Sequence, residues 1–451
     1  MAYASKRGRR PAEYASKSAH SQVINDPSVR DFLKKCALPK RAEEVSLSGH
    51  AELPFEPVTY NPIRHVIAID GGYDEVVVRS EFPSSTMCFF QFGALIFSVE
   101  DLESLEEQPF IDPDDMSKLK RIQRLKLALP VRNITFKEES TLTHSVRRAV
   151  YEFFRQKMDD ERLIDTLSWF IFQEYGPKVS AWTLASCPVC DAPNVQLRRT
   201  EMTGESTFSC DACGGEIYLT DVFRLHEAVD DELGAGGILG YVTTTVEQII
   251  LVHLIRLVLK IKPALLGQIL FIKDGPLAFF GQTANMHRPM RELVKHLLDH
   301  NALYLAGLEK SGPFVDHADE ITDKLEPGTV LILDNDYIYR YILPGKADPA
   351  NPYGRTTYYS NKLIFKTRGG QVYVASVPTR EVLAHLTEDD LENLPEILTN
   401  IEKLRCDMYD NALVPVALAN KLVSLANHPS SRILQKFATG AIRGSWDRSG
   451  Q

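Results

Sequence analysis

The residues with the most specific spacing in this sequence are four cysteines arranged as two C-x-x-C pairs. Cys187 and Cys190 form the first pair, and Cys210 and Cys213 form the second after an interval of 19 residues. Two such pairs supply four thiolates with the spacing of a tetrahedral zinc site. Because four sulfur ligands leave no position for a substrate, we expect this zinc ion to be structural. A redox dithiol pair and ordinary core cysteines are the alternatives.

Two aspartates share a second pattern, in which an apolar run is followed by Asp and Gly. Asp70-Gly71 ends one such run and Asp274-Gly275 ends another. A carboxylate at the end of a strand projects into the crevice where α/β sheets bind their ligands. Two such carboxylates on neighbouring strands can hold Mg²⁺ or Mn²⁺ through oxygen ligands. Asp and Gly also favour turns, so each motif taken alone is equally consistent with turn chemistry.

Glu247 is the candidate for a third carboxylate. It lies near the start of a long helix expected over 243–260, shortly before the Asp274 strand. An Asp/Glu/Asp cluster with divalent ions is a common arrangement for phosphodiester hydrolysis, because the ions activate water, orient the phosphate and stabilise the leaving oxygen. The alternative for Glu247 is a capping or surface role beside an apolar stripe.

Strands and helices that must position these residues alternate along the chain. Apolar and β-branched runs predict strands over 65–72, 75–79, 87–97, 267–276, 302–307, 329–333, 356–365 and 371–376. Apolar residues at intervals of three and four predict helices over 29–36, 140–156, 161–175, 243–260, 288–300, 379–386, 389–405 and 415–426. The first two strands are expected to pair across a turn at Gly71-Gly72. This order predicts an α/β fold with a mixed sheet.

Composition and charge limit the classes of function. The chain has 451 residues, of which 44% are hydrophobic and 25% charged, which excludes wholesale disorder and fibrous repeats. Its formal net charge of −9 means that contact with nucleic acid must use a local basic patch, for which Arg288, Arg291, Lys295 and the N-terminal tail are candidates. No GxxxxGK[ST] loop occurs, so we expect no ATP hydrolysis by this chain. The absence of GxSxG and HExxH motifs argues against the commoner hydrolase classes.

The sequence favours a cytoplasmic protein without a membrane span. Residues 1–20 are basic and polar and lack an apolar core segment. The longest apolar stretch, 249–261, is interrupted by His253, Arg256 and Lys260. The cysteine count of seven is odd and does not indicate a secreted disulfide framework.

On these residues the chain resembles the NurA nuclease family. The resemblance rests on the motifs around Asp70 and Asp274, on Glu247 in the preceding helix, on the segment 307–311 with Lys310, and on 413–420. It extends over about 64–424, outside an insertion at 130–239. The resemblance implies an RNase H-like core that degrades DNA with Mn²⁺ at Asp70, Glu247 and Asp274. It also implies a homodimer that works with the hexameric ATPase HerA.

The implied organisation has four parts. Residues 1–45 form a basic flexible lead, and 60–130 form the first part of the nuclease core. Residues 131–239 form a helical insertion that carries the zinc ribbon at 187–213. Residues 240–445 complete the core.

The sequence departs from the family pattern in two places. A C-terminal Ala-His pair is usual in the family, whereas here Ala419 is followed by Asn420. Asn can ligate a metal but cannot act as a general base near neutral pH, so either Asp407 or Asp410 takes that role or the activity is weaker. The zinc insertion also lies outside the minimal pattern and indicates a lineage-specific surface for DNA or a partner protein. Lys310 could steady a phosphate, the alternative being a solvated strand-end lysine.

These features predict a divalent-metal-dependent deoxyribonuclease that works with a HerA-like hexameric ATPase in DNA end processing or antiviral defence. The catalytic ion would be Mn²⁺ or Mg²⁺, and Zn²⁺ would be structural. The competing hypothesis is an inactivated nuclease fold that binds and regulates the ATPase through its zinc ribbon, which Asn420 supports. A third hypothesis is an RNA-directed nuclease with the same metal chemistry.

Overall fold

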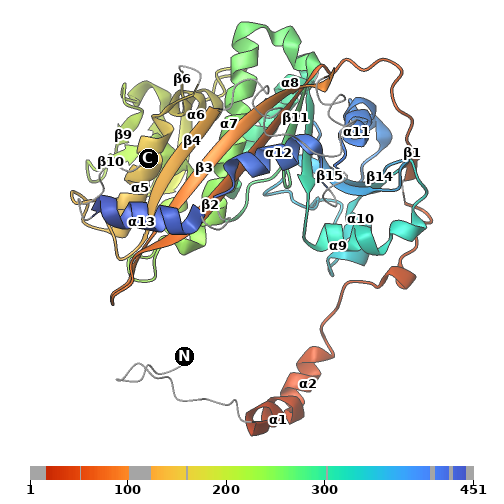
Figure 1. The fold of residues 1–451 in the computed structure, drawn as a ribbon, viewed down its shortest axis with the longest axis horizontal. Coiled ribbons are helices and arrows are strands. Elements are labelled where there is room, and N and C mark those ends of the chain that lie inside the picture. Colours follow the sequence, from red (N-terminus) through yellow and green to blue (C-terminus); the bar gives the residue numbers. More distant parts are fainter. Residues whose placement is uncertain are drawn as a thin grey trace.

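A mixed nine-stranded sheet is the centre of the computed structural model, which describes residues 17–50, 52–100, 123–158, 161–300, 303–406, 412–425 and 430–442. The strand order is β1-β13-β14-β15-β12-β11-β2-β3-β4 (Figure 1). The strands of this sheet are β1 (Glu52–Pro54), β2 (His65–Arg79), β3 (Ser85–Ser98), β4 (Gln123–Arg132), β11 (Ile269–Asp274), β12 (Tyr304–Glu309), β13 (Thr329–Leu333), β14 (Ser360–Lys366) and β15 (Val372–Pro378).

The central strands combine both pairing directions. Strand β2 is parallel to β11, and β11 is parallel to β12. Strand β3 is antiparallel to β2, and β4 is antiparallel to β3, so these three form a long meander on one side of β11. The remaining strands continue the sheet beyond β12 through antiparallel pairs. This large mixed sheet flanked by helices confirms the predicted α/β fold class with a mixed sheet.

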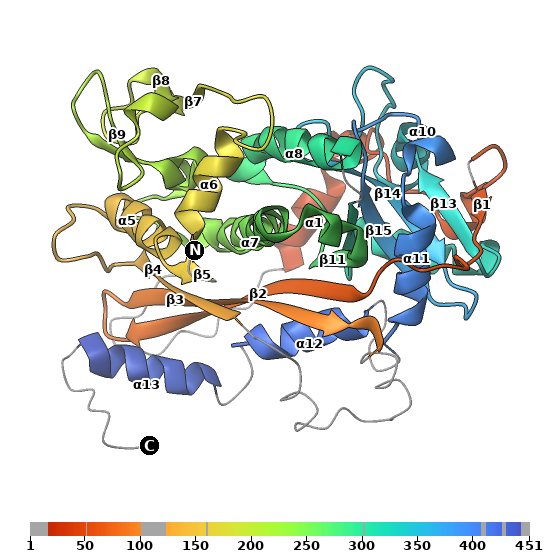
Figure 2. The ribbon, with the colours of Figure 1, turned by 90° about the horizontal axis from the view of Figure 1, so that it is seen from above.

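Helices cover both faces of the sheet, as Figure 2 shows for β2 and β3 between α7 and α12. One face packs against α5 (Leu142–Phe154), α6 (Leu163–Ile171), α7 (Leu239–Ile261) and α8 (His287–His300). The other packs against α11 (Leu394–Lys403) and α12 (Val414–Val423). Strand β2 has buried apolar side chains on both sides: Ile67 and Ile69 face α7, and Val66 and Ala68 face α12. A strand that is buried on both faces has a continuous apolar run instead of an alternating pattern, which explains the apolar run that precedes Asp70 in the sequence.

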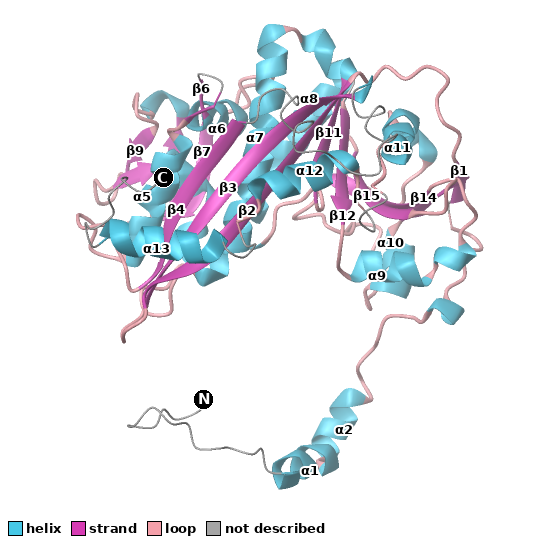
Figure 3. Cartoon of the chain, viewed as in Figure 1, coloured by secondary structure: helices cyan, strands magenta, loops and turns pink. Residues whose placement is uncertain are grey.

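Smaller elements surround this core. Helices α9 (Pro313–Glu320) and α10 (Asn335–Tyr337) cover β13, and α13 (Ser430–Ile442) packs against the far end of β2. Helices α1 (Lys17–Asn25) and α2 (Pro27–Leu33) stand apart from the sheet (Figure 3). Three short hairpins lie outside the main sheet: β5 (Lys157–Met158) with β6 (Glu161–Arg162), β7 (Ala181–Ser186) with β8 (Pro193–Arg198), and β9 (Thr207–Ser209) with β10 (Glu216–Tyr218).

The expected turn at Gly71-Gly72 is wrong, because β2 runs without interruption from His65 to Arg79 and pairs with β3 instead. The two glycines are required by close packing. A Cβ atom on Gly71 would lie 2.7 Å from Cδ1 of Phe92, and one on Gly72 would lie 2.8 Å from the backbone oxygen of Val423. Neither separation is compatible with a side chain, so the Gly-Gly pair leaves room for the Phe92 ring beside Gly71 and for the end of α12 beside Gly72.

Other predicted elements correspond to observed ones with shifted ends, apart from two. The helix expected over 29–36 is replaced by α1 and α2, and 379–386 forms no helix. Among the elements of the described chain that were not predicted are β1, β4, the three small hairpins, α9, α10 and α13. The predicted insertion at 131–239 begins within β4, and its apolar residues belong to the same cluster as those of α7. That it forms a separate domain stays a prediction.

By length and composition, one helix in the described part of the chain is long and apolar enough to cross a membrane, and it contains α7. In the structure this helix lies in the core, where Glu247, Gln248 and His253 are buried. Each has a polar partner: Lys273 for Glu247, Tyr359 for Gln248 and Thr166 for His253. Buried polar side chains paired with other core elements are typical of an internal helix.

Candidate active site and structural metal centre

Asp70 and Asp274 lie side by side on two parallel strands. Ile69 of β2 pairs with Lys273 of β11, so the next residue on each strand occupies the same level and the same face. That face is the one covered by α12, because Val66 and Ala68 on the same side of β2 belong to the apolar cluster of that helix. Strand β11 ends at Asp274, whereas β2 continues beyond Asp70. The two carboxylates therefore meet where the sheet opens between β2 and β12.

Glu247 reaches the same place from α7, on the opposite face of the sheet. Its Oε1 atom would lie only 3.1 Å from a Cβ on Gly71, so the missing side chain of this glycine lets Glu247 approach the backbone beside Asp70. The Gly71 amide donates a hydrogen bond to Oδ1 of Asp70 at 2.8 Å. Asp274 therefore lies beside Asp70 on one face of the sheet, and Glu247 approaches the backbone next to Asp70 from the other face.

Two lysines hold two of these carboxylates. Lys273 Nζ lies 2.9 Å from Oε2 of Glu247, and Lys310 Nζ lies 2.7 Å from Oδ2 of Asp274. Lys310 keeps about one-third of its side chain exposed while it pairs with Asp274. Sequence reasoning missed Lys273, although a lysine inside the apolar run of β11 was the available signal, since a buried ammonium requires a charged or polar partner.

Burial raises the pKa of Asp70 to about 7, and the nearby charges of Asp274 and Glu247 act in the same direction. Burial also raises the pKa of Glu247, which the Lys273 ammonium opposes. The Oδ2 atom of Asp70 is buried and has no hydrogen-bond partner. A charged or protonated oxygen in that position lacks the interaction that buried polar atoms normally make.

The donor set fits a hard divalent cation. Three carboxylates offer the oxygen ligands that Mg²⁺ and Mn²⁺ prefer, and one oxygen of Asp70 has no hydrogen-bond partner among the described residues. The three carboxylates do not all lie within 4.8 Å of one another. Glu247 and Asp274 instead form ion pairs with Lys273 and Lys310.

The auxiliary candidates differ in where the structure places them. Asn420 lies on α12 with its side chain exposed, on the helix that covers the face of Asp70. Asp407 and Asp410 lie outside the described residues. Lys310 is therefore the auxiliary residue whose position is established, through its ion pair with Asp274.

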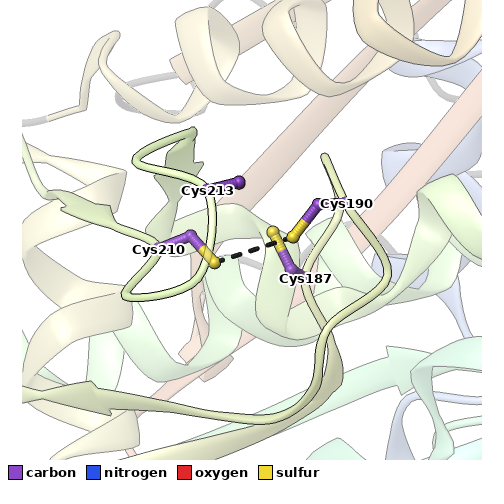
Figure 4. A group of neighbouring side chains, drawn as sticks. All are labelled: Cys187, Cys190, Cys210 and Cys213. Carbon is purple, nitrogen blue, oxygen red and sulfur yellow. Dashed lines mark hydrogen bonds between the residues drawn. The ribbon is translucent and has the colours of Figure 1, made fainter.

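The four cysteines converge at the tips of two hairpins (Figure 4). Cys187 and Cys190 lie at the turn between β7 and β8, and Cys210 and Cys213 at the turn between β9 and β10. Each pair therefore has a hairpin of its own.

Their sulfur atoms all lie within 4.8 Å of one another, with 3.9 Å between Cys190 and Cys210. A tetrahedron with Zn–S bonds of about 2.3 Å has S–S edges of about 3.8 Å. Backbone amides also approach the sulfurs: Val189 N–H donates to Cys187 at 3.4 Å and Gly215 N–H donates to Cys213 at 3.3 Å. The cluster is compatible with a closed zinc site.

A comparison with family models finds no match, and a comparison with curated proteins finds none. Among solved structures, the chain is similar to the NurA nuclease from Sulfolobus solfataricus, with 8% identity and a TM-score of 0.33 over 97% of this chain and 100% of that one. It is also similar to NurA with manganese, with 12% identity and a TM-score of 0.29 over 93% and 96%. A further NurA structure has 9% identity and a TM-score of 0.31 over 96% and 99%. At these TM-scores the similarity carries no argument about chemistry, so function must be argued from the site itself.

The buried Asp70 predicts an unusual dependence of stability on pH. An aspartate in an unfolded chain has a pKa of about 3.9, whereas in the folded chain the pKa of Asp70 is about 7. Between these values the folded state binds more protons than the unfolded state, so the contribution of Asp70 to stability falls as the pH rises from about 4 to 7. At 1.36 kcal/mol per pKa unit, the cost at pH 8 is on the order of 4 kcal/mol.

Asp70→Asn removes this charge, so in EDTA the variant should be more stable than the unaltered protein at pH 8 and nearly equal at pH 4. Urea unfolding at both pH values measures the difference. Glu75→Gln, an exposed change on the same strand, is the control. Equal stabilities of Asp70→Asn and the unaltered protein at pH 8 would show that the charge of Asp70 does not destabilise the fold.

Proposed function

We propose that this chain is a divalent-metal-dependent nuclease that hydrolyses DNA phosphodiesters. The observation that carries the proposal is that Asp70, which has a buried carboxylate oxygen without a hydrogen-bond partner, lies close enough to Asp274 of β11 and Glu247 of α7 for their charges to raise its pKa. Three carboxylates raise each other's cost of ionisation, and a divalent cation is the ligand that relieves this repulsion. Carboxylate clusters of this kind are suited to phosphodiester hydrolysis.

The residues of the chain have distinct tasks in this mechanism. Asp70, Glu247 and Asp274 would hold Mn²⁺ or Mg²⁺, which supplies an activated water and neutralises charge on the phosphate. Lys273 compensates the charge of buried Glu247. Lys310 is about one-third exposed and pairs with Asp274 at the edge of the site, where its ammonium can bind a phosphate oxygen of the substrate.

The test of this function is cleavage of linear DNA by EDTA-treated protein after addition of Mn²⁺, Mg²⁺ or Ca²⁺. We expect cleavage with Mn²⁺ or Mg²⁺ and none in EDTA. RNA of the same sequence, assayed in parallel, separates a deoxyribonuclease from the RNA-directed alternative. Absence of DNA cleavage with every ion, in protein that retains its fold, would contradict the proposal.

The zinc ribbon, the homodimer, the HerA-like hexameric ATPase and the cytoplasmic location belong to the same proposal. The cysteine cluster supports a structural Zn²⁺, since all four ligand positions are sulfur. A motor partner is consistent with the absence of an ATP-binding loop from the sequence. Cofractionation with such an ATPase, and the mass of the complex in solution, would test these parts separately.

A catalytically weak adaptor is the second candidate, and two observations favour it. Lys273 and Lys310 already neutralise two of the three carboxylates, and Asn420 occupies the position expected for histidine. Titration with Mn²⁺ followed by electron paramagnetic resonance distinguishes the two functions. Tight Mn²⁺ binding that is lost in Asp274→Asn supports the enzyme. A concentration of free Mn²⁺ that the protein does not lower supports the adaptor.

A further inference from the structure

A cavity of about 740 Å³ lies beyond the end of β11, and we call it the arginine cavity. Its wall is formed by Phe280 after β11, by Arg288 and Arg291 at the start of α8, by Tyr339 in the π-helix Ile338–Ile342, and by the segment 351–358 before β14. Its volume is within the range of pockets that enclose small-molecule ligands. None of the three candidate catalytic carboxylates lines it.

The charges in the arginine cavity all have one sign. Arg288, Arg291 and Arg355 line it, and no Asp or Glu does. Burial lowers the pKa of Arg291, and the nearby Arg355 lowers it further. Arg288 is exposed and makes no hydrogen bond or ion pair with any residue that the structure describes. Glu292 lines a separate cavity of about 330 Å³ on the other side of these arginines.

Three guanidinium groups that line one cavity without a carboxylate repel each other, which an anion between them would relieve. Arg291 donates to the carbonyl oxygens of Tyr358 and Gly354 at 2.8 and 3.3 Å and so has its paired donors occupied. Arg355 donates one bond, from Nη1 to Asn351 Oδ1, and Arg288 donates none within the described chain. Guanidinium groups bind phosphate through paired N–H donors, so a phosphate on Arg288 and Arg355 is the anion that matches this arrangement.

Aromatic rings form the rest of the wall. Phe280, Tyr339, Tyr353 and Tyr358 line the cavity, and their rings contact one another in an unbroken series with centroid separations of 5.4 to 6.2 Å. Arginines combined with aromatic rings are the combination that binds single-stranded nucleic acid, through phosphate contacts and base stacking. A paired base inside a duplex has no free face for such stacking.

The arginine cavity is connected to the carboxylates by a short and well-fixed segment. Six residues separate Asp274 from Phe280, which limits their distance to about 20 Å. Gln248, next to Glu247 on α7, donates to the carbonyl oxygen of Ala278 at 3.2 Å and accepts from the Tyr359 hydroxyl. A strand of a few nucleotides bound at the carboxylates can therefore extend into the cavity.

We propose that the arginine cavity is a subsite for one nucleotide of a single-stranded DNA segment, with its phosphate on Arg288 and Arg355 and its base stacked on Tyr339. This assignment rests on the proposed nuclease function. It places an unpaired nucleotide near the carboxylates, so the substrate reaches them with its strands separated.

The test is binding of a fluorescent oligo(dT) to the full chain in EDTA, where no cleavage takes place. We expect Arg288→Ala to weaken binding at least fivefold and to reduce the slope of log affinity against log salt by about 0.7, the value for one lost phosphate contact on a single strand. Tyr339→Leu should weaken binding at least fivefold, and Tyr339→Phe, which keeps the ring, should bind as the unaltered protein does.

Arg64→Ala is the matched control, since this exposed arginine precedes β2 at the opposite end of the parallel strands. Competition with dTMP and with inorganic phosphate separates the sources of the phosphate, and the oligonucleotide should bind more tightly than either. Tighter binding of dTMP would overturn the assignment to a DNA strand.

The two proposals can fail independently. Oligonucleotide binding that Arg288→Ala and Tyr339→Leu leave unchanged, in protein that cleaves DNA with Mn²⁺, would overturn the subsite and leave the nuclease proposal standing. Binding that depends on both residues, in protein that cleaves no DNA, would support the subsite and overturn the nuclease proposal.

Discussion

Replacement of Asp70 or Asp274 by asparagine should reduce metal-dependent DNA cleavage by about 10³-fold or more while preserving the fold. Each substitution keeps the shape of the side chain but removes a negative charge from the place where three carboxylates converge. A metal ion contributes several kcal/mol of transition-state stabilisation, and each 1.4 kcal/mol corresponds to about a tenfold change in rate. Single-turnover cleavage at saturating Mn²⁺ measures the loss.

Glu75→Gln is the control for this experiment, because it removes an exposed carboxylate from the same strand as Asp70. It should leave the rate within about twofold of the unaltered protein. Since Asp70→Asn is also expected to stabilise the protein at pH 8, its loss of activity can be separated from unfolding. Activity retained within tenfold in both Asp70→Asn and Asp274→Asn would place the chemistry elsewhere.

Removal of zinc from the cysteine cluster should unfold the two hairpins that carry it. Structural zinc sites in small domains contribute about 10–16 kcal/mol of apparent binding free energy, which is also folding free energy. Cys187 is fully buried and belongs to the same apolar cluster as α7, so its loss should extend into the core. We therefore expect Cys187→Ser to lack zinc and to be cut rapidly by trypsin within 187–213.

Cys36→Ser is the matched control, since Cys36 is exposed and far from the cluster in sequence. Elemental analysis should find one zinc per chain in the unaltered protein and in this control. Strong chelators should lower the melting temperature of the unaltered protein and of Cys36→Ser. They should leave the melting temperature of Cys187→Ser unchanged, because that variant holds no zinc. A melting temperature unaffected by chelation would show that the hairpins fold without a metal.

The elements that follow simple hydrophobic periodicity could be predicted from the sequence. Strand β13 occupies the predicted residues, and α7 and α8 deviate at their ends by only a few positions. The sequence was enough to predict that the two cysteine pairs lie together, because two C-x-x-C pairs are the ligand spacing of structural zinc sites. Asp70 and Asp274 could be placed together because each directly follows an apolar run, and parallel pairing brings these runs into register, although β2 continues past Asp70.

The rest depended on contacts between distant segments. Gly71-Gly72 has the local signature of a turn, but Phe92 and Val423 need the space that side chains there would fill. The ion pair between Lys273 and Glu247 joins a strand to a helix earlier in the chain, which no local pattern reveals. The arginine cavity combines four separate segments, so only Arg288 and Arg291 could be named beforehand as parts of a basic patch.

The contact between Gly72 and Val423 fixes the order in which this molecule can mature during translation. Helix α12 packs on β2, and the Gln91 side chain donates to the backbone oxygen of Leu422 at 2.9 Å. Asp70 emerges early from the ribosome, whereas the helix that covers its face of the sheet emerges some 350 residues later. A growing polypeptide therefore holds its carboxylates in water, and a prematurely terminated product that ends before α12 never acquires the enclosed pocket.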